Sequence, residues 1–112
     1  ENYSFVSFFL PNEELAKNAH KALGEGGVDA NFYWYTNSWH YINGWEHLRN
    51  LKSLGNVTNV VRNQLKKLND TDFSKSDAVM SRTISSLVKI GWTEEEVLER
   101  AAKMKTAILS VL

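Results

Sequence analysis

Runs of aromatic and β-branched residues alternate along the chain with segments in which apolar residues recur at helical spacing. Residues 3–10 and 28–35 are runs of the first kind, and each predicts a strand. Pro11 ends the first run, and Asn12 can cap a helix that begins after it. The glycine-rich segment 24–27 should end this helix, because glycine takes the left-handed conformation at a helix C-terminus at little cost. The apolar face of the helix is formed by Leu15, Ala16, Ala19, Ala22 and Leu23.

The middle of the chain is predicted to be mainly helical. Residues 36–44 are polar and aromatic without a regular spacing of apolar positions, which predicts a loop. The residues that follow have apolar positions at helical spacing, which predicts helices, and their other faces are basic. The expected order is a loop at 36–44, basic amphipathic helices from Trp45 to about Leu54 and over 57–68, a polar connection at 69–76, a helical turn at 77–81 and a third strand at 83–90.

The last helix has a clear start signal. Thr93 and Glu96 have the spacing of a capping box, in which each side chain bonds the backbone N–H of the other. Glu94 and Glu95 add negative charge to the first turn, which suits the positive end of a helix. The apolar positions of this helix are Val97, Ala101, Met104, Ile108 and Val111, with Leu98 and Leu112 beside them, and its opposite face carries Arg100, Lys103 and Thr106.

This order of elements indicates an α+β fold, with a small, mostly antiparallel sheet of about three strands and helices packed mainly on one face. A length of 112 residues, of which 43% are hydrophobic, predicts a single domain spanning 1–112. The 13 basic and 13 acidic residues balance, which argues against a nucleic-acid partner. No run approaches the roughly 18 apolar residues that would span a membrane, and we expect no membrane partner. The absence of cysteine fits the reducing cytoplasm, so a cytoplasmic protein is expected.

The densest group of chemically versatile side chains lies in residues 33–47. It holds three of the four tryptophans and two of the three histidines. Aromatic rings with polar edges in an aperiodic segment suit stacking and hydrogen bonding to a polar ligand such as a sugar or a base. The alternative is structural: these rings would then form a small core under a loop, or an interface with a neighbouring domain.

The histidines do not predict a metal centre. His40 and His47 lie seven residues apart, His20 belongs to the first helix, and no nearby acid has a ligand spacing. No nucleophile–histidine–acid pattern or paired-carboxylate motif accompanies them either. We therefore expect neither a bound metal nor a catalytic residue within this chain.

Several of these segments resemble the C-terminal small domain of the DegT/DnrJ/StrS family of pyridoxal-phosphate-dependent sugar aminotransferases. Tyr35 and His40 match the Tyr and the second His of the family's His-Tyr-x-x-x-x-His loop at the same spacing, whereas Trp34 replaces the first His. The segment from Trp92 to Glu96 is similar to the opening of the family's last helix, and 82–85 is similar to the entry into its last strand. The resemblance covers nearly the whole chain in order.

The resemblance implies a role in sugar biosynthesis. This chain would be the C-terminal, substrate-shaping domain of a transaminase that moves an amino group, with glutamate as the expected donor, to a keto-sugar or nucleotide-linked sugar. The large domain that binds pyridoxal phosphate would be absent, so this segment would bind no cofactor and be inactive alone. The start at Glu1 without Met agrees with a piece of a longer protein, and family members are usually homodimers. The substrate-binding residues would be Tyr35, Asn37, Trp39 and His40.

One lysine needs separate treatment. The family's Schiff-base lysine often precedes a Gly-Glu-Gly-Gly segment, and Lys21 here precedes such a segment at 24–27. Lys21 is nevertheless too far from Ser7-Phe8, which the family keeps within a few residues of its lysine, and it lies in a good amphipathic helix. We therefore reject Lys21 as the Schiff-base lysine. The alternative function is a stand-alone α+β ligand-binding or protein-interaction module that uses the aromatic segment 33–47.

Overall fold

The computed structural model describes residues 4–37, 39–52 and 55–112, and within them the chain forms a three-stranded sheet with helices. The central strand is the last in sequence, so the sheet order is β1-β3-β2 with both pairs antiparallel. The strands are β1 (Phe5–Phe9), β2 (Asn31–Phe32) and β3 (Thr83–Leu87), and the helices are α1 (Glu13–Glu25), the 3₁₀ turn η1 (Ile42–Gly44), α2 (Glu46–Arg49), α3 (Asn59–Asn69), α4 (Ser74–Met80) and α5 (Glu94–Leu109).

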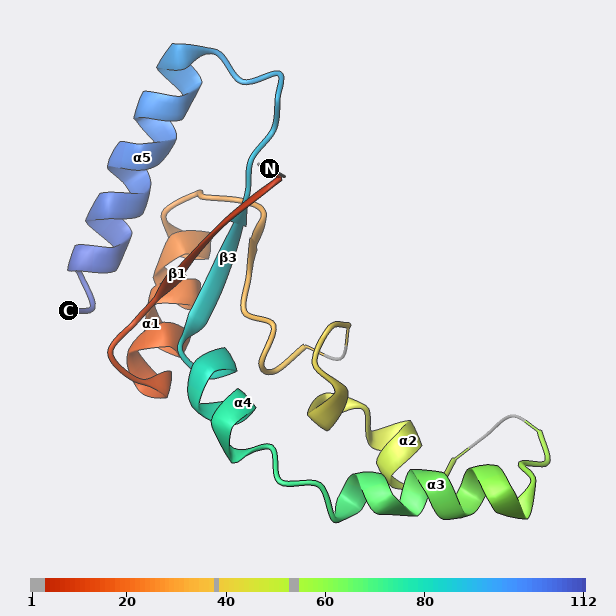
Figure 1. Ribbon diagram of the computed structural model, residues 1–112. Helices are drawn as coiled ribbons and strands as arrows, with labels where there is room; N and C mark the ends of the chain where they lie inside the picture. The colour runs from red at the N-terminus through yellow and green to blue at the C-terminus, as the bar shows by residue number, and fades with distance from the viewer. Residues whose placement is uncertain (1–3, 38, 53–54) are drawn as a thin grey trace.

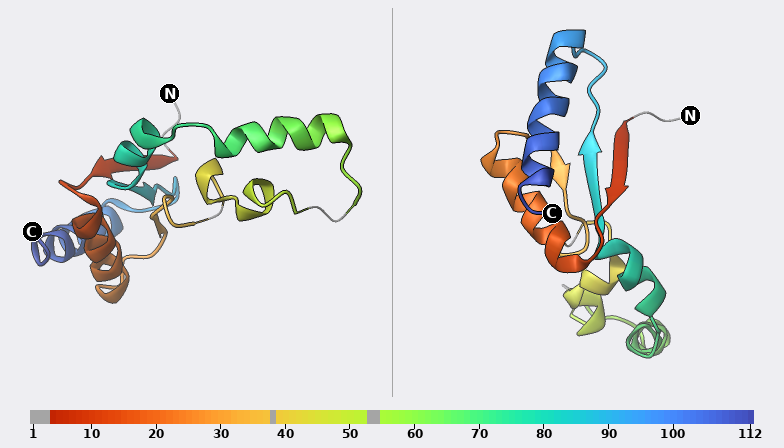
Figure 2. Two further views of the ribbon diagram at one scale, coloured as in Figure 1. Left: turned by 90° about the horizontal axis from the view of Figure 1, so that it is seen from below. Right: turned by 90° about the vertical axis from the view of Figure 1, so that its left-hand side faces the viewer.

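Helices α1 and α5 lie side by side over one face of the sheet, which confirms the predicted α+β fold with helices on one side (Figures 1 and 2). Ile84 of β3 and Leu23 of α1 are fully buried between these layers. Small side chains on the inner face of α1 allow the helix to approach the sheet closely. The buried core consists of Leu10, Ala16, Ala19, Leu23, Val28, Tyr33, Ile84 and Ala107.

The predicted helix signals are present as hydrogen bonds. The side chain of Asn12 accepts a bond from the Leu15 N–H at 2.9 Å and caps α1. Thr93 N–H donates to Glu96 Oε2 at 2.7 Å, and Glu96 N–H donates to Thr93 Oγ1 at 3.3 Å, which completes the capping box of α5. After α1 the chain reverses through Gly27, whose φ of 71° lies in the left-handed region that favours glycine.

Several predicted bounds were wrong. The strand expected over 28–35 is reduced to Asn31–Phe32, because Ala30 has a φ of 52° and interrupts extended backbone before it. The helix expected from Trp45 to Leu54 is only the single turn α2, since Leu51 has a φ of 53°. Helix α4 begins inside the segment expected to be a polar connection, and β3 ends at Leu87 rather than at residue 90. Parts of the expectations for residue 3 and for residues 53–54 lie outside the described residues.

Helices α2 and α3 form an arm, a name used here for the described residues 45–52 and 55–69, that projects from the sheet (Figure 1). The chain therefore extends 56 × 31 × 26 Å with a radius of gyration of 17.9 Å. A compact domain of this length would have a radius of gyration of about 13 Å. In the described residues no helix is both long and apolar enough to cross a membrane.

Candidate functional site

The backbone at residues 31–35 sends successive side chains to opposite sides of the sheet. Tyr33 is buried in the core, and its hydroxyl donates to the backbone oxygen of Ser81 at 2.8 Å. Phe32 instead pairs in register with Ser85 and makes a ring contact with Phe5 of β1. This alternation continues past the end of β2 at Phe32, because Trp34 stacks on Phe32 whereas Tyr35 contacts Tyr33, and it divides the aromatic segment into two separate clusters.

The first cluster covers the sheet face that α1 and α5 leave open, and we call it the open-face cluster: Phe5, Phe32, Trp34, Trp39 and His40. The rings of Phe32 and Trp34 stack with centroids 4.6 Å apart and planes 5° apart, and Phe5 meets Trp34 edge-on at 6.3 Å. His40 stands edge to face against Trp34 at 4.5 Å. Trp39 extends the cluster into solvent, because its side chain is 69% exposed and its ring lies 6.4 Å from that of His40.

Small residues on β3 make room for this cluster. Ser85 lies in the central strand between β1 and β2 and is buried, although it is on the open face. Its hydroxyl bonds the hydroxyl of Ser7 at 2.8 Å, which satisfies both polar groups at the strand pair. Because Ser85 carries no bulky side chain, the rings of Phe5 and Phe32 approach to 6.0 Å from the two flanking strands.

The second cluster contains the tyrosines on the helix side. Tyr35 lies between Tyr33 and Tyr41, with ring centroids 6.2 and 5.7 Å away. The hydroxyl of Tyr41 donates a short hydrogen bond to Oδ1 of Asp77 in α4, and the same oxygen accepts from Asn43 Nδ2 at 3.2 Å. Burial, then the hydrogen bond to Asp77, raises the pKa of Tyr41 to about 12. Tyr41 is therefore a neutral donor, and it joins the loop to α4.

The four residues predicted to bind substrate do not share one surface. His40 and Trp39 belong to the open-face cluster, whereas Tyr35 contacts the tyrosines on the helix side. Asn37 holds the loop itself, because its Oδ1 accepts a hydrogen bond from the Trp39 N–H at 2.8 Å. Their role in binding stays a prediction. Phe5, Phe32 and Trp34 were not predicted as site residues, although the period-two alternation in 31–35 could have placed the last two beside His40.

The described residues provide no metal centre, since no three His, Cys, Asp or Glu side chains among them converge. His20 is used in the core layer, where Nε2 lies 3.1 Å from the backbone oxygen of Asn31. Lys21 points into solvent with a side chain that is 76% exposed, and it pairs with Glu25 at 3.7 Å. An imine-forming lysine needs an enclosed cofactor pocket, so the surroundings of Lys21 do not fit pyridoxal phosphate.

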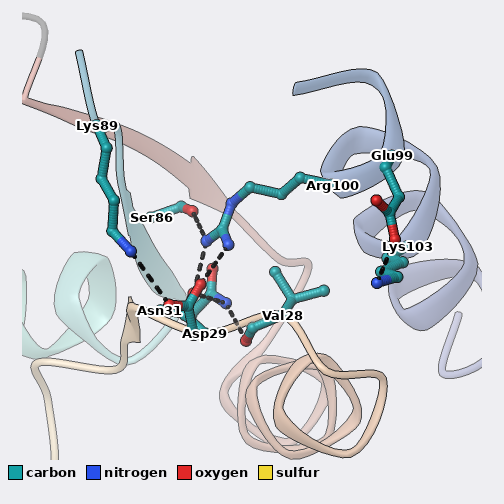
Figure 3. A network of polar contacts seen from close by, with 8 residues as sticks. All are labelled: Val28, Asp29, Asn31, Ser86, Lys89, Glu99, Arg100 and Lys103. Atoms are coloured by element: carbon teal, nitrogen blue, oxygen red, sulfur yellow. Dashed lines mark hydrogen bonds and ion pairs between the residues drawn. The ribbon is translucent and has the colours of Figure 1, made fainter. Parts of the chain in front are cut away.

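A polar network joins α5 to the other end of β2 (Figure 3). Arg100 donates from Nη1 to Asp29 Oδ1 at 2.7 Å and from Nη2 to the Asp29 backbone oxygen and to Ser86 Oγ, at 2.5 and 3.1 Å. Its guanidinium also lies 4.8 Å from the ring centre of Trp92. These hydrogen bonds, together with that of Lys89, lower the pKa of Asp29 below its usual value. Because Arg100 is already engaged by Asp29 and Ser86, the network acts as a structural connection between elements.

A comparison of the chain with protein-family models finds no matching family. The open-face cluster is therefore assessed on its own geometry. It combines the exposed rings of Phe5, Trp39 and His40 with the half-buried stack of Phe32 and Trp34, on a surface supported by the sheet. Such a surface can stack against the apolar face of a ring-shaped ligand and hydrogen-bond to polar groups at its edge.

Proposed function

We propose that this chain is the substrate-shaping small domain of a pyridoxal-phosphate-dependent aminotransferase that acts on a keto-sugar or nucleotide-linked sugar. The observation that carries the proposal is the placement of His40 against the stacked Phe32 and Trp34 rings on the open sheet face. A sugar ring has an apolar C–H face and a rim of hydroxyl groups. The exposed indole of Trp39 beside His40 offers a stacking face for the former, and the imidazole nitrogens of His40 offer hydrogen bonds for the latter.

The order of elements adds support to this proposal. The chain runs strand, helix, short strand, loop, helices, strand and helix, which is the order that the resemblance to the DegT/DnrJ/StrS small domain implies. Phe9 and Val6 of β1 are more than half exposed, so β1 offers apolar surface to a neighbouring large domain. In such an enzyme pyridoxal phosphate, when bound to the large domain, supplies the electron sink for amino-group transfer. The residues of this chain would orient the sugar and exclude water beside it.

The experiment compares His40→Ala with His47→Ala in the full reading frame that encodes these residues. Both are exposed histidines next to a tryptophan, but His47 stacks on Trp45, in the arm. We expect His40→Ala to raise KM for the keto-sugar about tenfold, the loss of one hydrogen bond to a substrate, and His47→Ala to leave it unchanged. The visible absorbance of bound pyridoxal phosphate should be the same in both variants. Full-length protein that shows no such absorbance would refute the aminotransferase role.

A second candidate is a stand-alone ligand-binding module, and one observation favours it. The rings of the open-face cluster hold one another in place across β1, β2 and the following loop, so their arrangement does not depend on another domain. This candidate predicts that the 112-residue chain alone binds a monosaccharide with a change in tryptophan fluorescence, and that Trp34→Ala abolishes the change. The aminotransferase proposal predicts weak or no binding by the chain alone, because the large domain would supply the other wall of the site.

A further inference from the structure

Helix α3 is amphipathic, and in the described part of the chain its main packing contact is with the short helix α2. None of its residues is buried, and Val60 and Val61 on its apolar side are 71% and 46% exposed. Leu65 and Leu68 are half-buried. A helix of 11 residues is marginal in water unless an apolar face is covered, because tertiary packing supplies most helix stability. The arm therefore presents a surface that needs a partner.

The arm is also strongly basic in a chain without net charge. Residues 45–69 contain Arg49, Lys52, Arg62, Lys66 and Lys67 but a single acid, Glu46. None of the five forms an ion pair with an acid in the described part of the chain, and Arg49 instead donates to Asn43 and Asn69. Because the whole chain is neutral, the rest of the molecule carries the compensating negative charge. An acidic surface with an apolar centre would be complementary to α3.

The first two turns of α5 provide such a surface. Glu94 and Glu95 are exposed, and the described residues give neither of them a basic partner. Leu98, one turn further on, is 63% exposed, and Val97 beside it is nearly half exposed. The start of α5 therefore combines exposed apolar and acidic side chains, which are complementary to the exposed apolar and basic side chains of α3.

These two surfaces cannot meet within one molecule. The start of α5 and the arm lie at opposite ends of the elongated chain in all views (Figures 1 and 2). Two copies placed antiparallel to each other would bring each arm to the start of the other copy's α5. A two-fold axis would then form the same contact twice, which is the usual symmetry of a protein dimer.

We propose that a second copy of this chain is the partner of the arm, with α3 of each copy docked on the N-terminal half of the other copy's α5. Val60 and Val61 would pack on Leu98, and Lys66 and Lys67 would approach Glu94 and Glu95. The proposal does not rest on the proposed function, because it depends only on the arm and on α5. Opposite charges at the rim of such a contact make association faster and dependent on salt.

The test is a charge exchange measured by sedimentation velocity of the 112-residue chain. We expect the wild type to be a dimer that dissociates as salt is raised. K66E/K67E should place glutamates of α3 against Glu94 and Glu95 of the other copy and raise the dissociation constant of the dimer at least tenfold. E94K/E95K should weaken the dimer equally, because it places lysines of α5 against Lys66 and Lys67. An equimolar mixture of the two variants should restore a dimer, because both contacts in the mixed pair again join opposite charges.

The control carries the same change at exposed lysines elsewhere, K75E/K105E, and should remain a dimer. Circular dichroism would show that each variant keeps its helices, so loss of association is not loss of fold. A wild type that is monomeric at every concentration and salt would overturn the proposal. So would a dimer that K66E/K67E leaves unchanged, or a mixture of the two reversed variants that stays monomeric. None of these readouts involves amino transfer, so the proposed function is tested separately.

Discussion

The ring of His40 meets the ring of Trp34 edge to face, with centroids 4.5 Å apart and planes at 86°. Edge-to-face contact is a favoured geometry for aromatic rings, because the positive edge of one ring meets the negative face of the other. Trp34 is held in turn by its stack on Phe32, which pairs with the central strand. An exposed imidazole is therefore oriented by a chain of contacts that begins in the sheet.

The first prediction concerns the stability that this chain of contacts provides. Trp34→Ala removes the ring contacts with Phe5, Phe32 and His40 and should lower the free energy of unfolding by about 2 kcal/mol, since Trp34 is half-buried. Trp39→Ala is the matched control and should cost less than about 0.5 kcal/mol, because Trp39 is largely exposed. Urea unfolding measures both. Equal losses of unfolding free energy in the two variants would show that the ring contacts of Trp34 do not stabilise the fold.

The ends of α1 and α5 could be predicted because their signals are local. Asn12 and the pair Thr93 and Glu96 bond backbone groups within three residues, so their effect does not depend on the rest of the fold. The length of β2 could not be predicted in this way. The positive φ of Ala30 follows from the way the chain leaves α1 and enters the sheet beside β3, which no local pattern specifies.

The four residues predicted to bind substrate come from one segment, and the structure divides them between the open-face cluster and the tyrosines on the helix side. Matching Tyr35 and His40 to a motif treats them as neighbours, whereas the turn that follows β2 places Tyr35 on the helix side and Trp34 on the open face. Phe5 lies far away in sequence and joins the cluster only because β1 and β2 flank the same strand. Such a partner depends on sheet order, which the sequence pattern leaves open.

The second prediction concerns the pH dependence of the Asp29–Arg100 pair. Hydrogen bonds from Arg100 and Lys89 lower the pKa of Asp29, so the pair contributes stability above the unfolded pKa of about 3.9 and loses it as pH falls through the lower folded pKa. Asp29→Asn should cost up to about 1 kcal/mol at pH 7, because the carboxylate is largely exposed and solvent screens the pair.

The measurement is the difference in unfolding free energy between wild type and Asp29→Asn over a series of pH values. This difference should shrink steadily below about pH 4, where the Asp29 carboxyl of the unfolded chain takes up a proton, and should level off once the solution passes the lower pKa of Asp29 in the folded chain. Glu14→Gln removes the same charge from an exposed position on α1 that has no ion pair in the described residues. A difference for Asp29→Asn that is constant with pH would assign its effect to shape and not to charge.

The third prediction concerns the buried tyrosines. Burial is the main cause that raises the pKa of both Tyr33 and Tyr41 to about 12. Both groups favour the folded state fully below their unfolded pKa of about 10, and this contribution is lost as pH rises toward 12. A titration followed by phenolate absorbance should therefore show tyrosines that ionise well above the usual pKa of about 10. Tyr41→Phe should remove one of these groups from the titration.

The same variant tests the connection between the loop and α4. Tyr41→Phe leaves Asp77 with Asn43 as its remaining side-chain donor, and the loss of a hydrogen bond to a charged group should cost about 1.5–3 kcal/mol. Tyr33→Phe serves as the comparison, because its hydroxyl donates to a neutral backbone oxygen and should cost about 1 kcal/mol. A larger loss for Tyr33→Phe would indicate that the bond to Asp77 is not the stronger one.

The last prediction concerns the capping box of α5. Thr93→Ala removes the oxygen that accepts from the Glu96 N–H and should lower the free energy of unfolding by about 1 kcal/mol. Thr106→Ala is the same change within the same helix, where the hydroxyl only bonds the backbone oxygen of Ala102 at 3.0 Å, and it should be neutral or slightly stabilising. If α5 also carries the docking surface proposed above, Thr93→Ala should weaken self-association in sedimentation as well, because the first turn that presents Glu94 and Glu95 would fray. A Thr93→Ala chain that loses stability but associates as tightly as the wild type would separate the capping box from that surface.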